Sequence, residues 1–216
     1  MRTNLKAQER EGRRTHILDA ARDLFAERGF PGTTMDLVAK SAGFTKRTVY
    51  GYFASKEELW CGAMARALEG LAARFREAAA ECASGFEQIA SMGLAFERFA
   101  QEESANFQMM TEGRTMVGSV ASETRGLREL GEAHGGMHAA MAEAIRQGIA
   151  DGSIRPDLDP EITAVLLAVY SSAVMSAVRQ ADPGSGTCLF PPESFMAQSQ
   201  DFIGHALRTP HKEEQP

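Results

Sequence analysis

The sequence has few cysteines, and their spacing excludes two common ways of stabilising a small fold. Cys61, Cys82 and Cys188 lie far apart, form no CxxC pair and have no histidine cluster beside them. This spacing offers neither a disulfide framework nor a zinc site. We therefore expect reduced, partly buried thiols. The alternative of a redox-sensing thiol has no support from neighbouring residues.

Long hydrophobic runs are lacking as well. No stretch approaches the roughly eighteen uninterrupted apolar residues that indicate a membrane-spanning helix. The segment 1–14 is charged and no apolar core follows it, so it does not resemble a signal peptide. Hydrophobic residues make up 44% of the chain and charged residues 24%, as in ordinary soluble globular proteins. We expect a cytoplasmic protein with no membrane partner.

Catalytic motifs are the third absence. The sequence contains no phosphate-binding loop, no nucleophile elbow and no paired catalytic carboxylates. Among its five histidines, His134 and His138 have the i, i+4 spacing of two metal ligands on one helix face. Gly135 follows His134, whereas zinc-peptidase helices have glutamate there. A solvated or pocket-lining histidine pair is the simpler interpretation, so we predict no enzyme, no metal site and no cofactor.

Charge is unevenly distributed along the chain. Residues 1–56 contain 11 Lys and Arg against 6 Asp and Glu, a balance of +5, although the whole chain has a net charge of −6. The remaining residues therefore have a balance of −11. A basic N-terminal segment on an acidic body indicates a polyanionic partner for that segment alone.

Apolar residues at helical spacing predict helices throughout and therefore an all-α fold. The expected helices cover 14–28, 33–41, 45–52, 55–83, 86–100, a short broken helix in 106–117, 127–150 with a kink at Gly135 and Gly136, 161–180 and 193–207. Thr33 with Asp36, and Ser55 with Glu58, have the spacing of helix-capping boxes. The tail 208–216 is charged and ends in proline, so we predict that it is disordered.

The segment 33–53 predicts a helix-turn-helix, because two short helices are joined by a tight glycine turn. Ala39 is small enough for close helix packing, Gly43 can adopt the positive φ of the turn, and Val49 points back into the core. The outward side chains suit DNA, since Lys and Arg reach guanine or phosphate and hydroxyls hold phosphates. The predicted DNA-binding residues are Thr34, Thr45, Lys46, Arg47, Thr48, Tyr50, Tyr52 and Lys56. A structural hairpin with a solvated basic face is the alternative.

Residues 42–59, which read AGFTKRTVYGYFASKEEL, resemble the signature of the TetR family of repressors. The family run is typically Ala-Gly-Val-Ser, two variable residues, Thr-Leu-Tyr, a variable residue, His or Tyr, Phe, then Lys-Glu-x-Leu. The resemblance covers about Arg13 to Trp60 and departs from the pattern at Phe44 and Thr45. It implies a three-helix DNA-binding domain over 1–56 and a larger helical ligand-binding and dimerisation domain over 57–207.

The resemblance also implies that the helices 161–180 and 193–207 pair with their copies in a homodimer that binds a palindromic operator. The helix 161–180 is apolar on nearly every side, which agrees, because such a helix must be buried on more than one face. The predicted interface residues are Ile162, Val165, Leu166, Val169, Ala173, Val174, Phe195 and Phe202.

A small-molecule pocket in the larger domain is a further implication of the resemblance. Methionines are plentiful there and supply adaptable apolar surface, although filling the core explains any one of them equally well. The predicted pocket residues are Phe96, Arg98, Met109, Met110, Arg114, Met137, His138, Met141 and Tyr170. The predicted function is a dimeric repressor that a small, mostly apolar ligand releases from DNA. An effector-independent DNA-binding regulator and a helical protein-interaction adaptor are the alternatives.

Overall fold

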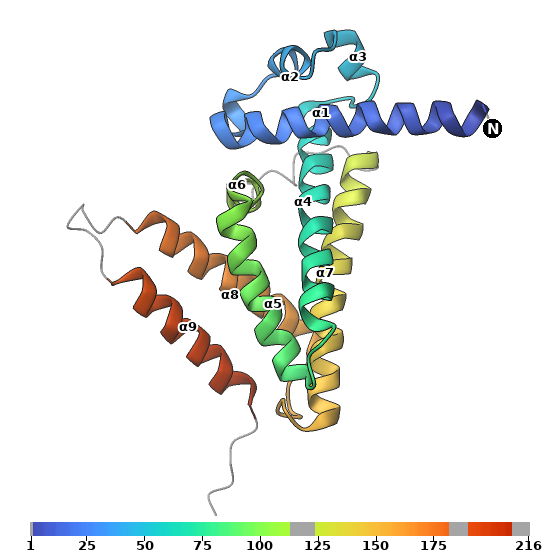
Figure 1. The fold of residues 1–216 in the computed structure, drawn as a ribbon. Coiled ribbons are helices and arrows are strands. Elements are labelled where there is room, and N and C mark those ends of the chain that lie inside the picture. The colour runs from blue at the N-terminus through green and yellow to red at the C-terminus, as the bar shows by residue number, and fades with distance from the viewer. Residues whose placement is uncertain (1, 113–123, 182–189, 209–216) are drawn as a thin grey trace, which may run out of the picture. The chain divides into compact units, whose positions relative to one another are not determined.

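The computed structural model describes residues 2–112, 124–181 and 190–208, with side chains from residue 5 onward except that of Glu112. These residues form α-helices joined by short connections and contain no strand, which confirms the predicted all-α class (Figure 1). Two compact units are present, Met1–Gly70 with Gln101–His134, and Leu71–Ala100 with Gly135–Pro216. The predicted boundary near residue 56 stays a prediction. Arg114, Cys188 and the predicted tail beyond Arg208 lie outside the described residues.

The two units share three long helices that continue from one into the other. The first unit contains α1 (Arg2–Gly32), α2 (Met35–Ser41), α3 (Lys46–Tyr50), α6 (Ser104–Glu112) and the first parts of α4 (Lys56–Ala79) and α7 (Arg125–Asp151). The second unit contains most of α5 (Gly85–Glu102), α8 (Pro160–Gln180), α9 (Pro192–Leu207) and the remaining parts of α4 and α7.

Helix α1 begins twelve residues earlier than the sequence predicted, at Arg2 rather than residue 14. The side chains of residues 5–13 are all exposed, so no apolar stripe in the sequence marked this part of the helix. The predicted stop is confirmed, because the backbone leaves the helical region at Gly29, where φ is 66°. Pro31 follows, and its ring disfavours a continuous helix through this point.

The core of the first unit fixes α2 to the end of α1. Thr33 is fully buried, and its hydroxyl donates to the carbonyl oxygens of Leu24 and Gly29, at 3.1 and 2.9 Å. The predicted cap at Thr33 is therefore wrong. Thr34 caps α2 instead, with its hydroxyl accepting from the Leu37 N–H at 3.3 Å. The fully buried large side chains of this core are Ile17, Leu18, Phe25, Val38, Phe53, Leu59, Leu68 and Phe107.

A closed ring of charged side chains ties α1 to the start of α7. Arg14, only 6% exposed, donates to Glu129 at 2.5 Å and lies 3.5 Å from Glu11. Arg125 closes the ring, at 2.7 Å from Glu129 and 3.2 Å from Glu11. Removing one member of a buried ion pair leaves an uncompensated charge, which is strongly unfavourable. The ring therefore holds α1 in one orientation against α7.

In the second unit, α5 and α7 pack with their backbones in contact. A Cβ atom at Gly85 would lie 2.1 Å from the Gly148 nitrogen and 2.3 Å from the Ala144 oxygen. The Gly85 N–H also donates to the carboxylate of Asp151, the last residue of α7, at 2.8 Å. Hydrogen bonds from Ser153 and Gly85 lower the pKa of Asp151. The ionised Asp151 therefore stabilises the fold fully above the ordinary carboxyl pKa of about 4. This stabilisation is lost as the pH falls through the lowered pKa of Asp151.

The expected kink in α7 is absent. Gly135 and Gly136 lie within one continuous helix from Arg125 to Asp151, and neither has a positive φ. A glycine pair permits a bend but does not impose one, because glycine also adopts helical angles.

Helix α8 has an apolar face that its own unit leaves exposed. By length and composition α8 could cross a bilayer, and only 28% of its most apolar 18-residue stretch is buried within the protein. Counting uninterrupted apolar residues missed this, because Thr163, Ser171 and Ser172 interrupt the run. Helices of soluble proteins that bury apolar faces have the same length and composition, so these properties alone do not indicate a membrane. The predicted absence of a membrane partner stays a prediction.

Candidate nucleic-acid interface

Helices α2 and α3 lie across a tight turn on one side of α1 (Figure 1). Gly43 has a φ of 68°, as predicted, and the Phe44 N–H returns to the Ala39 carbonyl oxygen at 2.9 Å. Thr45 begins α3, because its hydroxyl accepts from the Thr48 N–H at 3.1 Å. Val49 is fully buried, so the opposite side of this short helix faces outward.

Helix α3 is shorter than predicted and ends at Tyr50 rather than near Tyr52. Gly51 caps it, and the N–H groups of Gly51 and Tyr52 close the last turn on preceding carbonyl oxygens. Glycine weakens a helix because it loses more backbone entropy than other residues on folding. Tyr52 therefore lies outside α3, on the connection to α4.

The eight predicted DNA-binding residues are all at least partly exposed, but they differ in what their side chains already do. Those exposed are Thr34, Thr45, Lys46, Arg47 and Tyr50, and those half-buried are Thr48, Tyr52 and Lys56. Neither the Arg47 guanidinium nor the Tyr50 hydroxyl hydrogen-bonds another residue in the described part of the chain. These two are therefore available to a partner without breaking an existing contact.

Two predicted contact residues already have partners within the domain. The Lys46 Nζ is paired with Asp36 of α2, at 2.9 and 3.0 Å, and this hydrogen bond raises the pKa of Lys46. The Lys56 Nζ donates to the Phe30 carbonyl oxygen at 2.7 Å and lies 4.2 Å from the centre of the Phe30 ring. Lys46 thus joins α3 to α2, and Lys56 joins α4 to the end of α1.

Two residues of α1 beside this region were not predicted. The Arg10 guanidinium lies 5.8 Å from the centre of the Tyr52 ring. The His16 ring meets Phe44 edge-on at 6.0 Å. The sequence contained a signal for Arg10, because Lys6, Arg10 and Arg13 recur at helical spacing.

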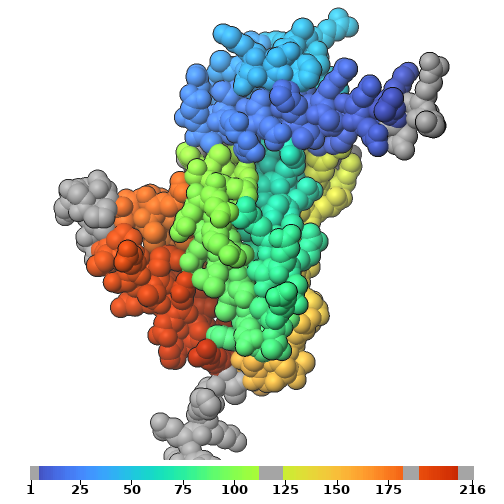
Figure 2. All heavy atoms as spheres, viewed as in Figure 1, coloured from blue at the N-terminus to red at the C-terminus, as the bar shows by residue number. Residues whose placement is uncertain are grey.

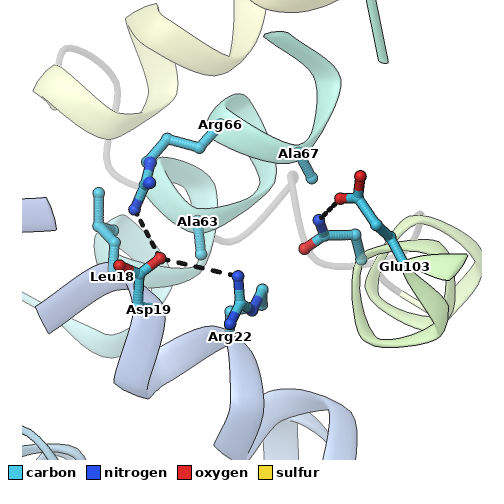
Figure 3. A pocket seen from close by; sticks show the side chains of 8 residues that line it. Leu18, Asp19, Arg22, Ala63, Arg66, Ala67 and Glu103 are labelled. Atoms are coloured by element: carbon cyan, nitrogen blue, oxygen red, sulfur yellow. Dashed lines mark hydrogen bonds and ion pairs between the residues drawn. The ribbon is translucent and has the colours of Figure 1, made fainter. Parts of the chain in front are cut away.

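A small polar cleft lies between α1, α4 and α6, with a volume of about 160 Å³ (Figure 3). Asp19 is 2.9 Å from Arg66 and 3.7 Å from Arg22, and Asn106 donates to Glu103 at 2.6 Å. The lining residues are Leu18, Asp19, Arg22, Ala63, Arg66, Ala67, Glu103 and Asn106, none of which was predicted as a ligand contact. Pockets for drug-sized ligands are larger, about 300–1,000 Å³, and mostly apolar. This cleft does not match the predicted apolar pocket.

The predicted pocket residues are divided between the two units, so their grouping stays a prediction. Phe96, Met109, Met137 and Met141 are buried, and Met110, His138 and Tyr170 are half-buried. Arg98 is exposed on α5, which argues against the predicted role as a polar anchor inside a pocket.

The two described cysteines form no disulfide with one another. Cys61 is fully buried, and burial raises the pKa of its thiol to about 11, so the reactive thiolate is scarce at neutral pH. Cys82 is half-buried, and its Sγ lies 3.3 Å from the Ala78 carbonyl oxygen.

Most predicted dimer residues share one exposed stripe of α8. Their spacing is that of a single helix face, and Phe202 of α9 stacks on Tyr170 beside it, with ring centres 5.9 Å apart. The exposed fractions are 62% for Ile162, 45% for Val165, 61% for Leu166, 42% for Val169 and 64% for Phe202, and Ala173 is also exposed. Phe195 is half-buried against Phe190. Val174 is a correction, because it is buried within its own unit.

Curated transcriptional regulators are similar to this chain over part of its length. The FasR transcriptional activator of Mycolicibacterium smegmatis is 29% identical over 103 residues, which are 48% of this chain and 47% of FasR. The UidR transcriptional regulator of Escherichia coli is 41% identical over 69 residues, 32% of this chain and 35% of UidR. The chain thus spans less than half the length of these curated relatives.

The similarity of fold is more extensive. The FadR regulator of Bacillus subtilis, solved in complex with stearoyl-CoA, superposes with a TM-score of 0.70 at 18% identity, over 89% of this chain and 98% of FadR. The family model described as "Bacterial regulatory proteins, tetR family" matches residues 17–60. The segment 17–60 therefore matches the TetR family of bacterial regulatory proteins, and the described residues share the fold of the FadR regulator.

Proposed function

We propose that the protein is a dimeric transcriptional repressor that binds a palindromic operator through α3 and is released by a small, mostly apolar ligand. The observation that carries the DNA-binding part is the outward face of α3. This face is held by the buried Val49 and the Gly43 turn, and it presents Arg47 and Tyr50, whose side chains have no hydrogen bond to another described residue. Arginine is the side chain that most often reads guanine in the major groove.

Arg47→Ala is expected to weaken operator binding and to relax specificity at one base pair. A true base contact costs about 1–3 kcal/mol when it is removed. Lys46→Ala should have a smaller effect, because Lys46 must first leave Asp36. Tyr50→Phe should weaken binding to all sequences about equally, because a phosphate contact positions the protein without reading bases.

The measurement is fluorescence anisotropy with a duplex selected from random sequence by the wild-type protein. Arg128→Ala, which changes an exposed arginine of α7, is the matched control. Circular dichroism establishes that each variant retains its helices. Unchanged affinity of both Arg47→Ala and Lys46→Ala would rule out α3 as the recognition helix.

The ligand part of the proposal is supported by the apolar interior of the second unit. Phe96 of α5 and Met137 and Met141 of α7 are buried there, and unbranched methionine side chains repack readily around an apolar guest. FadR, with the same fold, was solved with a fatty acyl thioester. Helix α4 runs from this unit to the connection 51–55, which joins it to α3. Movement of α4 would therefore reposition the recognition helix.

A ligand that releases the operator must bind the free protein more tightly than the DNA-bound protein, by the factor by which it weakens DNA binding. We expect a tenfold to hundredfold factor, or about 1.4–2.8 kcal/mol. Thermal-shift screening of long-chain acyl compounds, followed by operator titrations with each stabilising compound, measures it. Compounds that bind tightly yet leave operator affinity unchanged would favour an effector-independent regulator. A wild-type protein with no salt-dependent DNA binding would favour the adaptor.

A further inference from the structure

The first part of α1 buries none of its described side chains, residues 5–13, in its own unit. The family model matches from residue 17, whereas α1 begins at Arg2. Every side chain in 5–13 is exposed, and the N-terminal turns extend past α2 and α3 in the space-filling view (Figure 2). Because none of these side chains is buried, burial of an apolar stripe does not account for this extension.

One face of this extension is basic. Lys6, Arg10 and Arg13 follow the i, i+4, i+7 spacing that places side chains on one helix face. Glu9 lies at the edge of that face, so the face has a net charge of +2. Glu11 points to another side, where it pairs with Arg14 and Arg125 of the charged ring. The acidic side chain is therefore directed to α7, away from the basic face.

Two contacts orient the basic face relative to the recognition helix. Arg10 lies over the ring of Tyr52, which directly follows α3, and His16 touches Phe44, which directly precedes it. Arg13 is three residues from each, so it lies on the part of α1 that faces α3. The stacked Tyr52 ring also holds the Arg10 guanidinium in place before any partner binds.

We propose that Lys6, Arg10 and Arg13 form a second DNA contact, which binds backbone phosphates beside the half-site read by α3. At 1.5 Å per residue, the stripe from residue 6 to residue 13 is about 10 Å long, or about three base pairs along the duplex axis. Phosphate contacts of this kind add affinity but read no bases. The inference rests on the proposed DNA-binding function, and it extends the DNA contacted by the protein to base pairs that flank the operator.

The test uses two double variants. The first combines Arg10→Gln and Arg13→Gln, and the second, a matched control, combines Arg76→Gln and Arg128→Gln. The control removes two exposed arginines that lie outside the stripe. Affinity is measured by fluorescence anisotropy across a range of salt concentrations, on the selected duplex with and without five flanking base pairs at each end. A third variant, Arg10→Lys with Arg13→Lys, keeps the charge.

We expect the glutamine variant to bind the long duplex at least tenfold more weakly while its base preferences stay unchanged. Its log–log salt slope should be shallower by about 0.9 for each phosphate that the variant no longer neutralises. The flanks should strengthen binding of the wild type, the lysine variant and the control, but not of the glutamine variant. Circular dichroism identifies any loss of helix, and the lysine variant then separates the effect of charge from an effect on folding.

Wild-type affinity that does not depend on the flanks, or a glutamine variant with the wild-type salt slope, would overturn the inference and leave the α3 interface standing. Such a result is distinct from failure of the proposed function, in which the wild-type protein selects no duplex at all and both ideas fall. We expect the basic face to strengthen binding to an unselected duplex as well, because phosphate contacts are independent of sequence.

Discussion

Val169→Glu is expected to convert the protein from a dimer to a monomer and to abolish tight operator binding. Val169 lies at the middle of the α8 stripe, between Leu166 and Ala173. It is 42% exposed within its own chain, so the substitution leaves the fold of one protomer intact. In the proposed symmetric interface the same carboxylate would be buried, twice, facing apolar side chains of the other copy.

The physical reason is the size of the exposed apolar face. Ile162, Leu166 and Phe202 are each more than 60% exposed, and large contiguous apolar patches of this kind mark interaction sites. We expect such a monomer to bind DNA poorly, because the proposed palindromic operator would be held by two recognition helices about 34–36 Å apart. A protein with a single recognition helix can occupy only one half of such an operator.

Light scattering at micromolar concentration measures the mass, and anisotropy measures operator affinity. Ala139→Glu is the control, because it adds the same charge at an exposed position of α7. A monomeric wild type, or a Val169→Glu variant that remains a dimer, would show that α8 is not the interface. Wild-type protein that binds lipid vesicles would instead assign the stripe to a bilayer, consistent with the hydropathy of α8.

The turn of the DNA-binding domain could be predicted from the sequence because its determinants are local. Gly43 adopts the expected positive φ, and Val49 is buried six residues later. Thr45 supplies the first hydrogen bond of α3 within three residues. Such caps and turns depend on atoms a few bonds apart, and a contiguous stretch of sequence therefore specifies them.

Contacts between distant residues could not be predicted in this way. Lys46 and Arg47 look equivalent in the sequence, but Lys46 is held by Asp36, ten residues away. Arg14 and Glu129 are 115 residues apart, and nothing in the spacing of either indicates that they pair. Side-chain partners of this kind are set by how helices pack, which periodicity alone does not determine.

Periodicity also failed where a helix has no apolar stripe. The first turns of α1 are exposed on all sides, so the hydrophobic pattern gave no reason to extend the helix before residue 14. Val174 shows the opposite error. It is apolar like its neighbours and was predicted to lie in the dimer interface, but it is buried within its own unit. The pattern identifies an apolar residue, and only packing decides which surface buries it.

Gly85→Ala is expected to destabilise the fold by about 3 kcal/mol or more, because the new Cβ would overlap backbone atoms. The nearest of these are the Gly148 nitrogen at 2.1 Å and the Ala144 oxygen at 2.3 Å. Backbone atoms inside a helix cannot rotate away as a side chain does. Helix α5 must therefore move off α7, and the Gly85 N–H must release the Asp151 carboxylate.

Gly93→Ala on the same helix provides a control of opposite sign. A Cβ at Gly93 would meet no atom within 4 Å, so the substitution adds helix propensity without a clash. Alanine in place of glycine within a helix stabilises it by about 0.5–1 kcal/mol. Thermal unfolding by circular dichroism should place Tm about 6 °C or more below the wild type for Gly85→Ala, at 2–4 °C per kcal/mol, and slightly above it for Gly93→Ala. A Gly85→Ala variant with the wild-type Tm would mean that α5 and α7 do not approach through this glycine. A lowered Tm in both variants would mean that backbone freedom in α5, rather than close packing, is what the fold requires.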